Sequence, residues 1–245
     1  MPAIQALPAA CPACGVILAK VAQGTPGRAA PPPTHAPTAR QDADDDRITL
    51  RALLLHVPER VDPLRWWLRV ALLAGFAAWG LWLMALDVKT GSIMGSFIHL
   101  PLLVFHEAGH VIFMPLGHTL TVLGGMLGQC LMPLIMAGAL LLKNRDPFGA
   151  ALALWLLGVS VMDTAPYMYD ALQPQLTLLS GQTGEEGGHD WIELFGSWGL
   201  LPRAQAIGLA THKLGALVML AALSWAGWVL KRQHPRLDAR ALLDE

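Results

Sequence analysis

Residues 92–114 read SIMGSFIHLPLLVFHEAGHVIFM, a run that is apolar except for a few polar side chains. A helix needs about 20 such residues to cross the hydrocarbon core of a bilayer, so this run is long enough to do so. It also carries His106, Glu107 and His110. Ionisable side chains inside a membrane span are costly and mostly serve a function. The stretch therefore predicts a membrane helix that contains a functional site.

Four further stretches have the length and composition of membrane spans: 66–86, 121–142, 148–172 and 207–230. Charged residues make up 14% of the chain, against about 25% in soluble domains, and the mean hydropathy is +0.45. This composition argues against a cytosolic enzyme and against a disordered regulator. We expect an all-α fold, a polytopic integral membrane helix bundle with about five transmembrane helices.

Charge and cysteine content exclude two other classes. The formal net charge is −1, so the chain has no basic field that would recruit nucleic acid. Three cysteines in 245 residues are too few for a disulfide-rich secreted scaffold. The expected partners are the lipid bilayer and other membrane proteins or peptides, and the sequence indicates no oligomeric state.

The composition changes sharply at about residue 48. We expect a CxxC segment at 1–23, a flexible, disordered Pro/Ala-rich linker at 24–47, a transmembrane domain at 48–232, and a polar C-terminal tail at 233–245. Cys11 and Cys14 form the CxxC knuckle and supply two of the four ligands that a structural zinc site needs. The pair is the remnant of a zinc ribbon, a knuckle completed by a partner chain, or a redox pair.

His106-Glu107-Ala-Gly-His110 is an HExxH motif. Positions i and i+4 lie on one face of a helix, so both imidazoles can reach one metal ion. Glu107 adjoins the first histidine and can polarise a metal-bound water, whose pKa zinc lowers to about 7. The alternative without function is a helix end at the lipid headgroups, where water hydrates these polar side chains. That alternative does not explain a histidine pair that flanks a glutamate.

A zinc site needs a third protein ligand, and the sequence offers two candidates. Asp163 lies about as deep in its predicted span as the motif does in its own, and the two spans should run parallel. His189 follows two glycines in the loop after that span. Asp163 is the preferred candidate. A neutral, hydrogen-bonded Asp163 and an exposed loop His189 are the structural alternatives.

The third predicted span carries Gly124 and Gly128, a GxxxG motif that is typical of close helix packing. Gln129 follows it, and its amide is a candidate for binding a substrate backbone, although a packing role is the simpler interpretation. His99 lies on the same helix face as His106. We expect it to form an interhelical hydrogen bond or to face a pore.

HEAGH in a predicted span, followed two spans later by an intramembrane aspartate, resembles the site-2 protease-like intramembrane zinc metalloproteases. The likeness covers about residues 92–172 and is closest to a small bacterial type with an N-terminal zinc-ribbon-like CxxC knuckle. It implies one catalytic zinc held by His106, His110 and Asp163, with Glu107 as the base, and a location in the bacterial inner membrane. Asp163 lies in Met-Asp-Thr here, whereas the family has Leu-Asp-Gly or Asn-Pro-Asp-Gly.

The expected function is therefore zinc-dependent hydrolysis of peptide bonds in membrane-embedded or juxtamembrane substrates, with residues 48–232 as the metalloprotease-like domain. The first alternative is a non-enzymatic metal-ion transporter or sensor in which His99, His106, His110, Asp163 and Asp170 line a path. A relative that keeps the fold and only binds is the second alternative.

Overall fold

Long apolar helices dominate the computed structural model, which describes residues 49–239. Four stretches in this range are long and apolar enough to cross a membrane. They contain the helices α3 (Pro63–Ala85), α5 (His118–Leu142), α6 (Pro147–Asp170) and α8 (Ala204–Gln233). Residues 49–239 contain no β-strand. The prediction of an all-α chain with the composition of a multi-pass membrane protein is confirmed at this level, and the expected count of about five spans stays a prediction.

Shorter helices connect the long ones. The α-helices among them are α2 (Leu50–Leu54), α4 (His99–Phe113) and α7 (Asp190–Ser197). Single 3-10 turns are η1 (Val88–Thr90), η2 (Ser92–Gly95), η3 (Met114–Leu116), η4 (Gly184–Glu186), η5 (Leu201–Arg203) and η6 (His234–Arg236). Several boundaries follow from local chemistry: Asp62 caps α3 by accepting from the Arg65 amide at 2.7 Å, and prolines occupy the first turns of α3 and α6.

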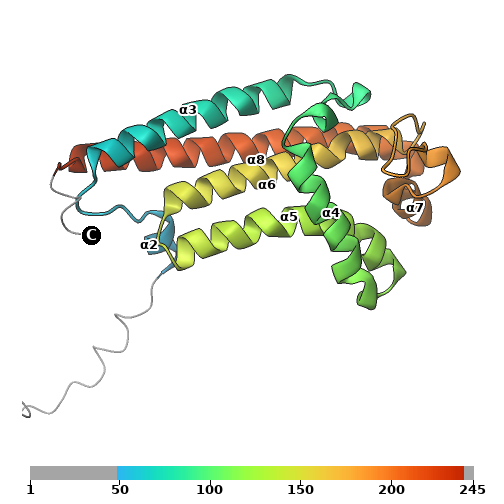
Figure 1. The fold of residues 1–245 in the computed structure, drawn as a ribbon, viewed down its shortest axis with the longest axis horizontal. Helices are drawn as coiled ribbons and strands as arrows, with labels where there is room; N and C mark the ends of the chain where they lie inside the picture. Colours follow the sequence, from blue (N-terminus) through green and yellow to red (C-terminus); the bar gives the residue numbers. More distant parts are fainter. Residues whose placement is uncertain (1–48, 240–245) are drawn as a thin grey trace, which may run out of the picture. The chain divides into compact units, whose positions relative to one another are not determined.

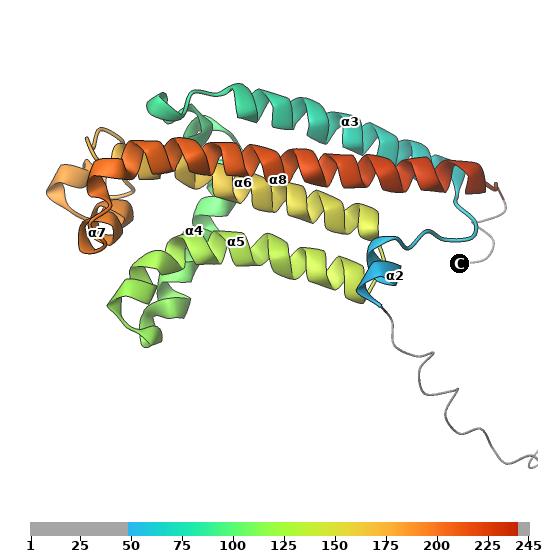
Figure 2. The ribbon, with the colours of Figure 1, turned by 180° about the vertical axis from the view of Figure 1, so that it is seen from behind.

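The helix α6 lies at the centre of the arrangement. It packs against α8 on one side and α5 on the other, and α3 packs against α8 (Figure 1; Figure 2). In its most apolar window 67% of the residues are buried, against 11–22% in the other three long helices. The outer faces of α3, α5 and α8 instead expose large apolar side chains, as lipid-facing helices do.

The helix that carries the HExxH motif differs from the expected span at 92–114. Residues 92–95 form the turn η2, Ser96 is extended, and α4 begins only at His99. At 15 residues α4 is about 22 Å long, which is less than the roughly 30 Å of the hydrocarbon core. Figure 1 shows α4 crossing the direction of the long helices rather than running alongside them.

Glycines allow α4 to approach α5 closely. A Cβ atom on Gly109 would lie 2.0 Å from the carbonyl oxygen of Gly124, and one on Gly128 would lie 2.4 Å from that of Phe105. The helix backbones are therefore in direct contact, and the packing role predicted for Gly124 and Gly128 is confirmed.

Glycines also allow α6 and α8 to pack with their backbones in contact. A Cβ atom on Gly215 of α8 would lie 2.6 Å from the carbonyl oxygen of Gly158 on α6, and a Cβ on Gly208 would lie 2.7 Å from that of Ala165. Between these contacts Met162 and Met219 are fully buried in a cluster that also contains Trp155. Backbone contact thus fixes the central helix against α8, which makes it a rigid base for the residues near its C-terminal end.

Residues 233–239 continue the fold, whereas the sequence suggested that a polar tail begins at 233. Gln233 is the buried last residue of α8, and Leu237 bridges to Val61. The guanidinium of Arg236 donates to the backbone carbonyl of Val57 at 2.6 Å. The predicted segments 1–23 and 24–47, with Cys11 and Cys14, lie outside the described residues.

We expect Gly128→Ala to destabilise the protein and Gly138→Ala, on the same helix, not to. The new methyl group at 128 meets the α4 backbone, and such overpacking costs about 1–3 kcal/mol. At Gly138 no atom lies within 4 Å of the new Cβ, so the gain in helix propensity remains. Thermal unfolding in detergent micelles compares the two variants. Equal melting temperatures would contradict the close contact.

Candidate metal centre

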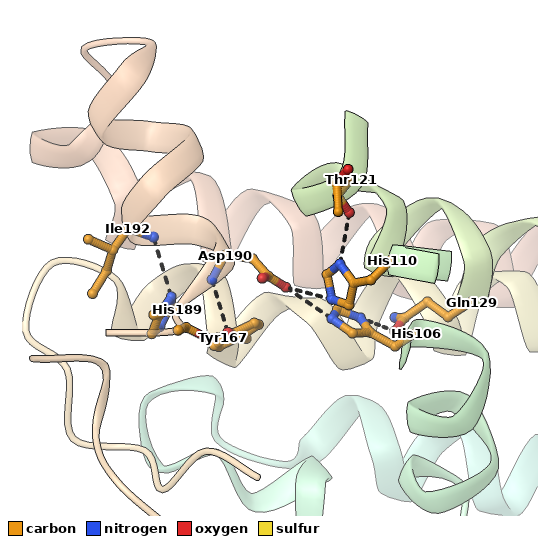
Figure 3. A network of polar contacts seen from close by, with 9 residues as sticks. His106, His110, Thr121, Gln129, Tyr167, His189, Asp190 and Ile192 are labelled. Carbon is orange, nitrogen blue, oxygen red and sulfur yellow. Dashed lines mark hydrogen bonds and ion pairs between the residues drawn. The ribbon is translucent and has the colours of Figure 1, made fainter. Parts of the chain in front are cut away.

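The two motif histidines converge on one carboxylate. The Nε2 atoms of His106 and His110 lie 3.0 Å and 3.4 Å from Oδ2 of Asp190, the first residue of α7 (Figure 3). One ligand atom from each of the three residues falls within 4.8 Å of the others. Two imidazoles from one helix and a carboxylate from a distant segment are thus gathered at a single point, which is the arrangement of a candidate metal site.

Hydrogen bonds on the far side of each ring orient the histidines. Nδ1–H of His106 donates to Oε1 of Gln129 at 3.1 Å, and Nδ1–H of His110 donates to the backbone carbonyl of Thr121 at 2.8 Å. These acceptors require a proton on Nδ1 in both rings, so Nε2, which faces Asp190, is the nitrogen that each ring can offer to a metal ion once a metal displaces its proton. Metal-binding histidines are held in this way in most sites.

The helix α5 makes room for His106 and fixes its position. A Cβ atom on Gly125 would lie 2.3 Å from Nε2 of His106, so only glycine accommodates the ring there. Gln129 is 2% exposed, and its Nε2 donates to the backbone carbonyl of Ser160 on α6 at 2.8 Å. Both ends of the Gln129 amide, predicted as a substrate-binding group, are therefore engaged within the protein, where they link α4 to α6.

Asp190 is held in place through its backbone and its neighbours. Its amide donates to the hydroxyl of Tyr167 on α6 at 3.0 Å. His189 caps α7, because its Nδ1 accepts from the amide of Ile192 at 3.3 Å. Behind the cap α7 is amphipathic, and its apolar face is buried against α5, α6 and α8 by Trp191, Leu194 and Phe195. The carboxylate is thus presented by a docked helix rather than by a free loop.

The electrostatics of Asp190 suit a cation. Burial opposes ionisation, but the hydrogen bonds and charges of His106 and His110 outweigh it and lower the pKa of Asp190 below its usual value. The carboxylate is therefore anionic at neutral pH. An ionised carboxylate beside two imidazoles is a donor set that zinc prefers.

The side chain of Glu107 lines a cavity together with the three residues of the candidate metal site. A cavity of about 450 Å³ is lined by His106, Glu107, His110 and Asp190 together with residues of α6 and the segment 177–180. The Glu107 side chain is exposed, and among residues 49–239 it has no hydrogen bond or ion pair. A carboxylate beside the histidine pair, free to accept a proton, is what the HExxH pattern predicts for its glutamate.

Neither of the two residues predicted as a third ligand belongs to the group formed by His106, His110 and Asp190. Asp163 lines the cavity, but both of its oxygens lie 3.0 Å from Nδ1 of His99, so the expected interhelical bond of His99 is present. His189 is buried against Tyr167 with Nε2 3.4 Å from Asp170, and burial lowers its pKa although Asp170 and Asp190 oppose this. The third residue beside His106 and His110 is instead Asp190, which directly follows His189 in the sequence.

Sequence reasoning missed Asp190 although it examined the same Gly-Gly-His-Asp-Trp segment. The available signal was the start of an amphipathic helix, because a carboxylate in a first turn is fixed in direction by the helix behind it. No protein-family model, curated protein or solved structure matches this chain.

We expect Gln129→Ala to weaken metal binding by about 10–100-fold, because it removes the acceptor that orients His106. Thr121→Ala is the matched control, since His110 bonds to the backbone carbonyl of residue 121, which the substitution keeps. Competition with a chromophoric zinc chelator measures both affinities. Equal affinities in the two variants would contradict the orienting role of Gln129.

Proposed function

We propose that this protein is a zinc-dependent membrane peptidase and that His106, His110 and Asp190 hold its one catalytic zinc. The observation that carries the proposal is the convergence of two oriented Nε2 atoms on one ionised carboxylate. Three protein ligands of the types His, His and carboxylate, beside an open cavity, match the composition of hydrolytic zinc sites. Structural zinc sites instead use four protein ligands and leave no position for substrate.

The chemistry divides between the ion and Glu107. Zinc held by these three groups would supply Lewis acidity, which makes hydroxide available for attack at neutral pH and polarises a substrate carbonyl. The carboxylate of Glu107 accepts the proton of the attacking water. It then delivers that proton to the nitrogen of the leaving amine, which completes hydrolysis of the peptide bond.

The position of the cavity indicates the kind of substrate. It lies near the C-terminal end of α6 and the N-terminal end of α5, and its lining includes Leu103, Val122 and Leu179. A helical substrate hides its carbonyl groups in its own hydrogen bonds, so it must unwind before it can react. We propose membrane-embedded or juxtamembrane proteins and peptides as substrates.

The resemblance to site-2 protease-like enzymes and a bacterial inner membrane location remain part of the proposal. HExxH on a helix among membrane-length helices supports the resemblance, and the inner-membrane location follows from the resemblance alone. The third ligand differs from the one that the resemblance implies, because Asp190 rather than Asp163 accompanies the histidines. A transporter or sensor is the competing function, and the His99–Asp163 pair in the same cavity is the observation that favours it.

Glu107→Gln separates the enzyme from the transporter. The amide keeps the shape of the side chain but cannot accept the proton, so zinc content should stay unchanged while peptide cleavage falls by roughly 10²–10⁴-fold. Reconstituted wild type and variant are compared for bound zinc, cleavage of a panel of single-span substrates, and zinc flux. Zinc flux that is lost in the variant, with no cleavage by the wild type, would favour the transporter.

Two aspartate variants test the ligand set. Asp190→Asn removes the anionic ligand and should strip most of the zinc at stoichiometric metal, whereas Asp163→Asn should leave the zinc content unchanged. Both variants are made with Cys11 and Cys14 replaced by Ser, so that only the membrane site is counted by elemental analysis. The opposite pattern would return the third ligand to Asp163.

A further inference from the structure

A second polar pair lies in the cavity beside the metal cluster. Nδ1 of His99 is 3.0 Å from each oxygen of Asp163, and the side chains are 14% and 4% exposed. Among residues 49–239, His99 is the only partner of the Asp163 carboxylate. A buried carboxylate needs a compensating charge, and an imidazolium that donates Nδ1–H supplies it.

The bond to Asp163 uses Nδ1 of His99 and leaves Nε2 of the same ring available to bind another group. Because Nδ1–H is directed at Asp163, the second donor of the His99 imidazolium is Nε2–H. Nε2 has no hydrogen-bond partner within the described residues, and the His99 ring lines the cavity. Asp163 thus holds His99 so that it can offer one N–H group to a molecule in the cavity.

The spacing along α4 relates this donor to the metal cluster. His99 precedes His106 by two helical turns, so both lie on one face and about 10 Å apart along the axis. An extended peptide advances about 3.3 Å per residue. A substrate whose scissile bond lies at the cluster would therefore place a backbone carbonyl near His99 about three residues away.

We propose that His99 and Asp163 form a substrate subsite, in which Nε2–H of His99 binds a backbone carbonyl about three residues from the scissile bond. This inference rests on the proposed peptidase function and deepens it. His99 is the contacting residue, and Asp163 is a positioning residue that acts through it. The pair supplies only two potential metal ligands and has already committed one imidazole nitrogen, so a second metal site is the weaker interpretation.

Peptide hydroxamates test the subsite without a known substrate. The hydroxamate group anchors on zinc, and oligo-alanine tails of one to five residues extend from it, in one series toward the N-terminal side and in another toward the C-terminal side. In one series affinity should rise about tenfold when the tail reaches three residues, the effect of a hydrogen bond from a charged donor. Calorimetry on the zinc-loaded full chain in micelles measures the step.

A modified ligand and four protein variants assign the step to His99. Reducing the third amide carbonyl of the tail to a methylene group should abolish the step in the wild type, which needs no folded variant. His99→Ala and His99→Gln should bind all tail lengths with little difference, while Leu100→Ala, on the exposed face of the same helix turn, should keep the step. Asp163→Asn should weaken the step and leave the zinc content normal.

The outcomes separate the subsite from the peptidase proposal. If no hydroxamate binds and no zinc is present at the membrane site, the proposed function fails. If hydroxamates bind but neither series shows a step, or the step survives in both His99 variants, the subsite is wrong and the zinc site stands. Loss of zinc in Asp163→Asn would also overturn the inference and make Asp163 a ligand.

Discussion

The close contact between α4 and α5 is the constraint on which the candidate site depends. Where Gly109 meets Gly124 and Gly128, the two backbones touch, so the side chains on either side of Gly109 lie at fixed distances from α5. His106 then fits over Gly125 and reaches Gln129, and His110 reaches the carbonyl of residue 121. Larger residues at these glycines would separate the helices and release both imidazoles from their acceptors.

The third member of the cluster comes from α7, a helix that is distant from α4 in the sequence. Asp190 depends on α7, which is docked by its apolar face and joined to α6 by the contacts of Tyr167 with the Asp190 amide and with the His189 ring. The cluster is therefore built from two short helices, α4 and α7, that lie across or beside the ends of the long helices (Figure 1). The long helices provide a rigid frame, and the three residues of the candidate metal site lie in segments that are not long enough to cross a membrane.

Sequence patterns predicted the parts of this arrangement that depend on local spacing. The i, i+4 histidines, the long apolar helices and the glycine contact all follow from residue type and period. The third member of the cluster could not be found in this way, because the comparison of depths assumed that the motif helix runs parallel to α6. A turn at residues 92–95 shortens α4, and its oblique course places His99, not His106, against Asp163. Such a turn cannot be predicted from composition, because the residues that form it are as apolar as those of a continuous helix.

Zinc K-edge X-ray absorption on the purified chain, with Cys11 and Cys14 replaced by Ser, tests the central claim most directly. The account predicts one zinc per chain with nitrogen and oxygen neighbours at about 2.0–2.2 Å, including the outer-shell scattering of two imidazole rings. Zinc with no imidazole scattering, or with a single ring, would contradict the assignment of His106 and His110 as a ligand pair.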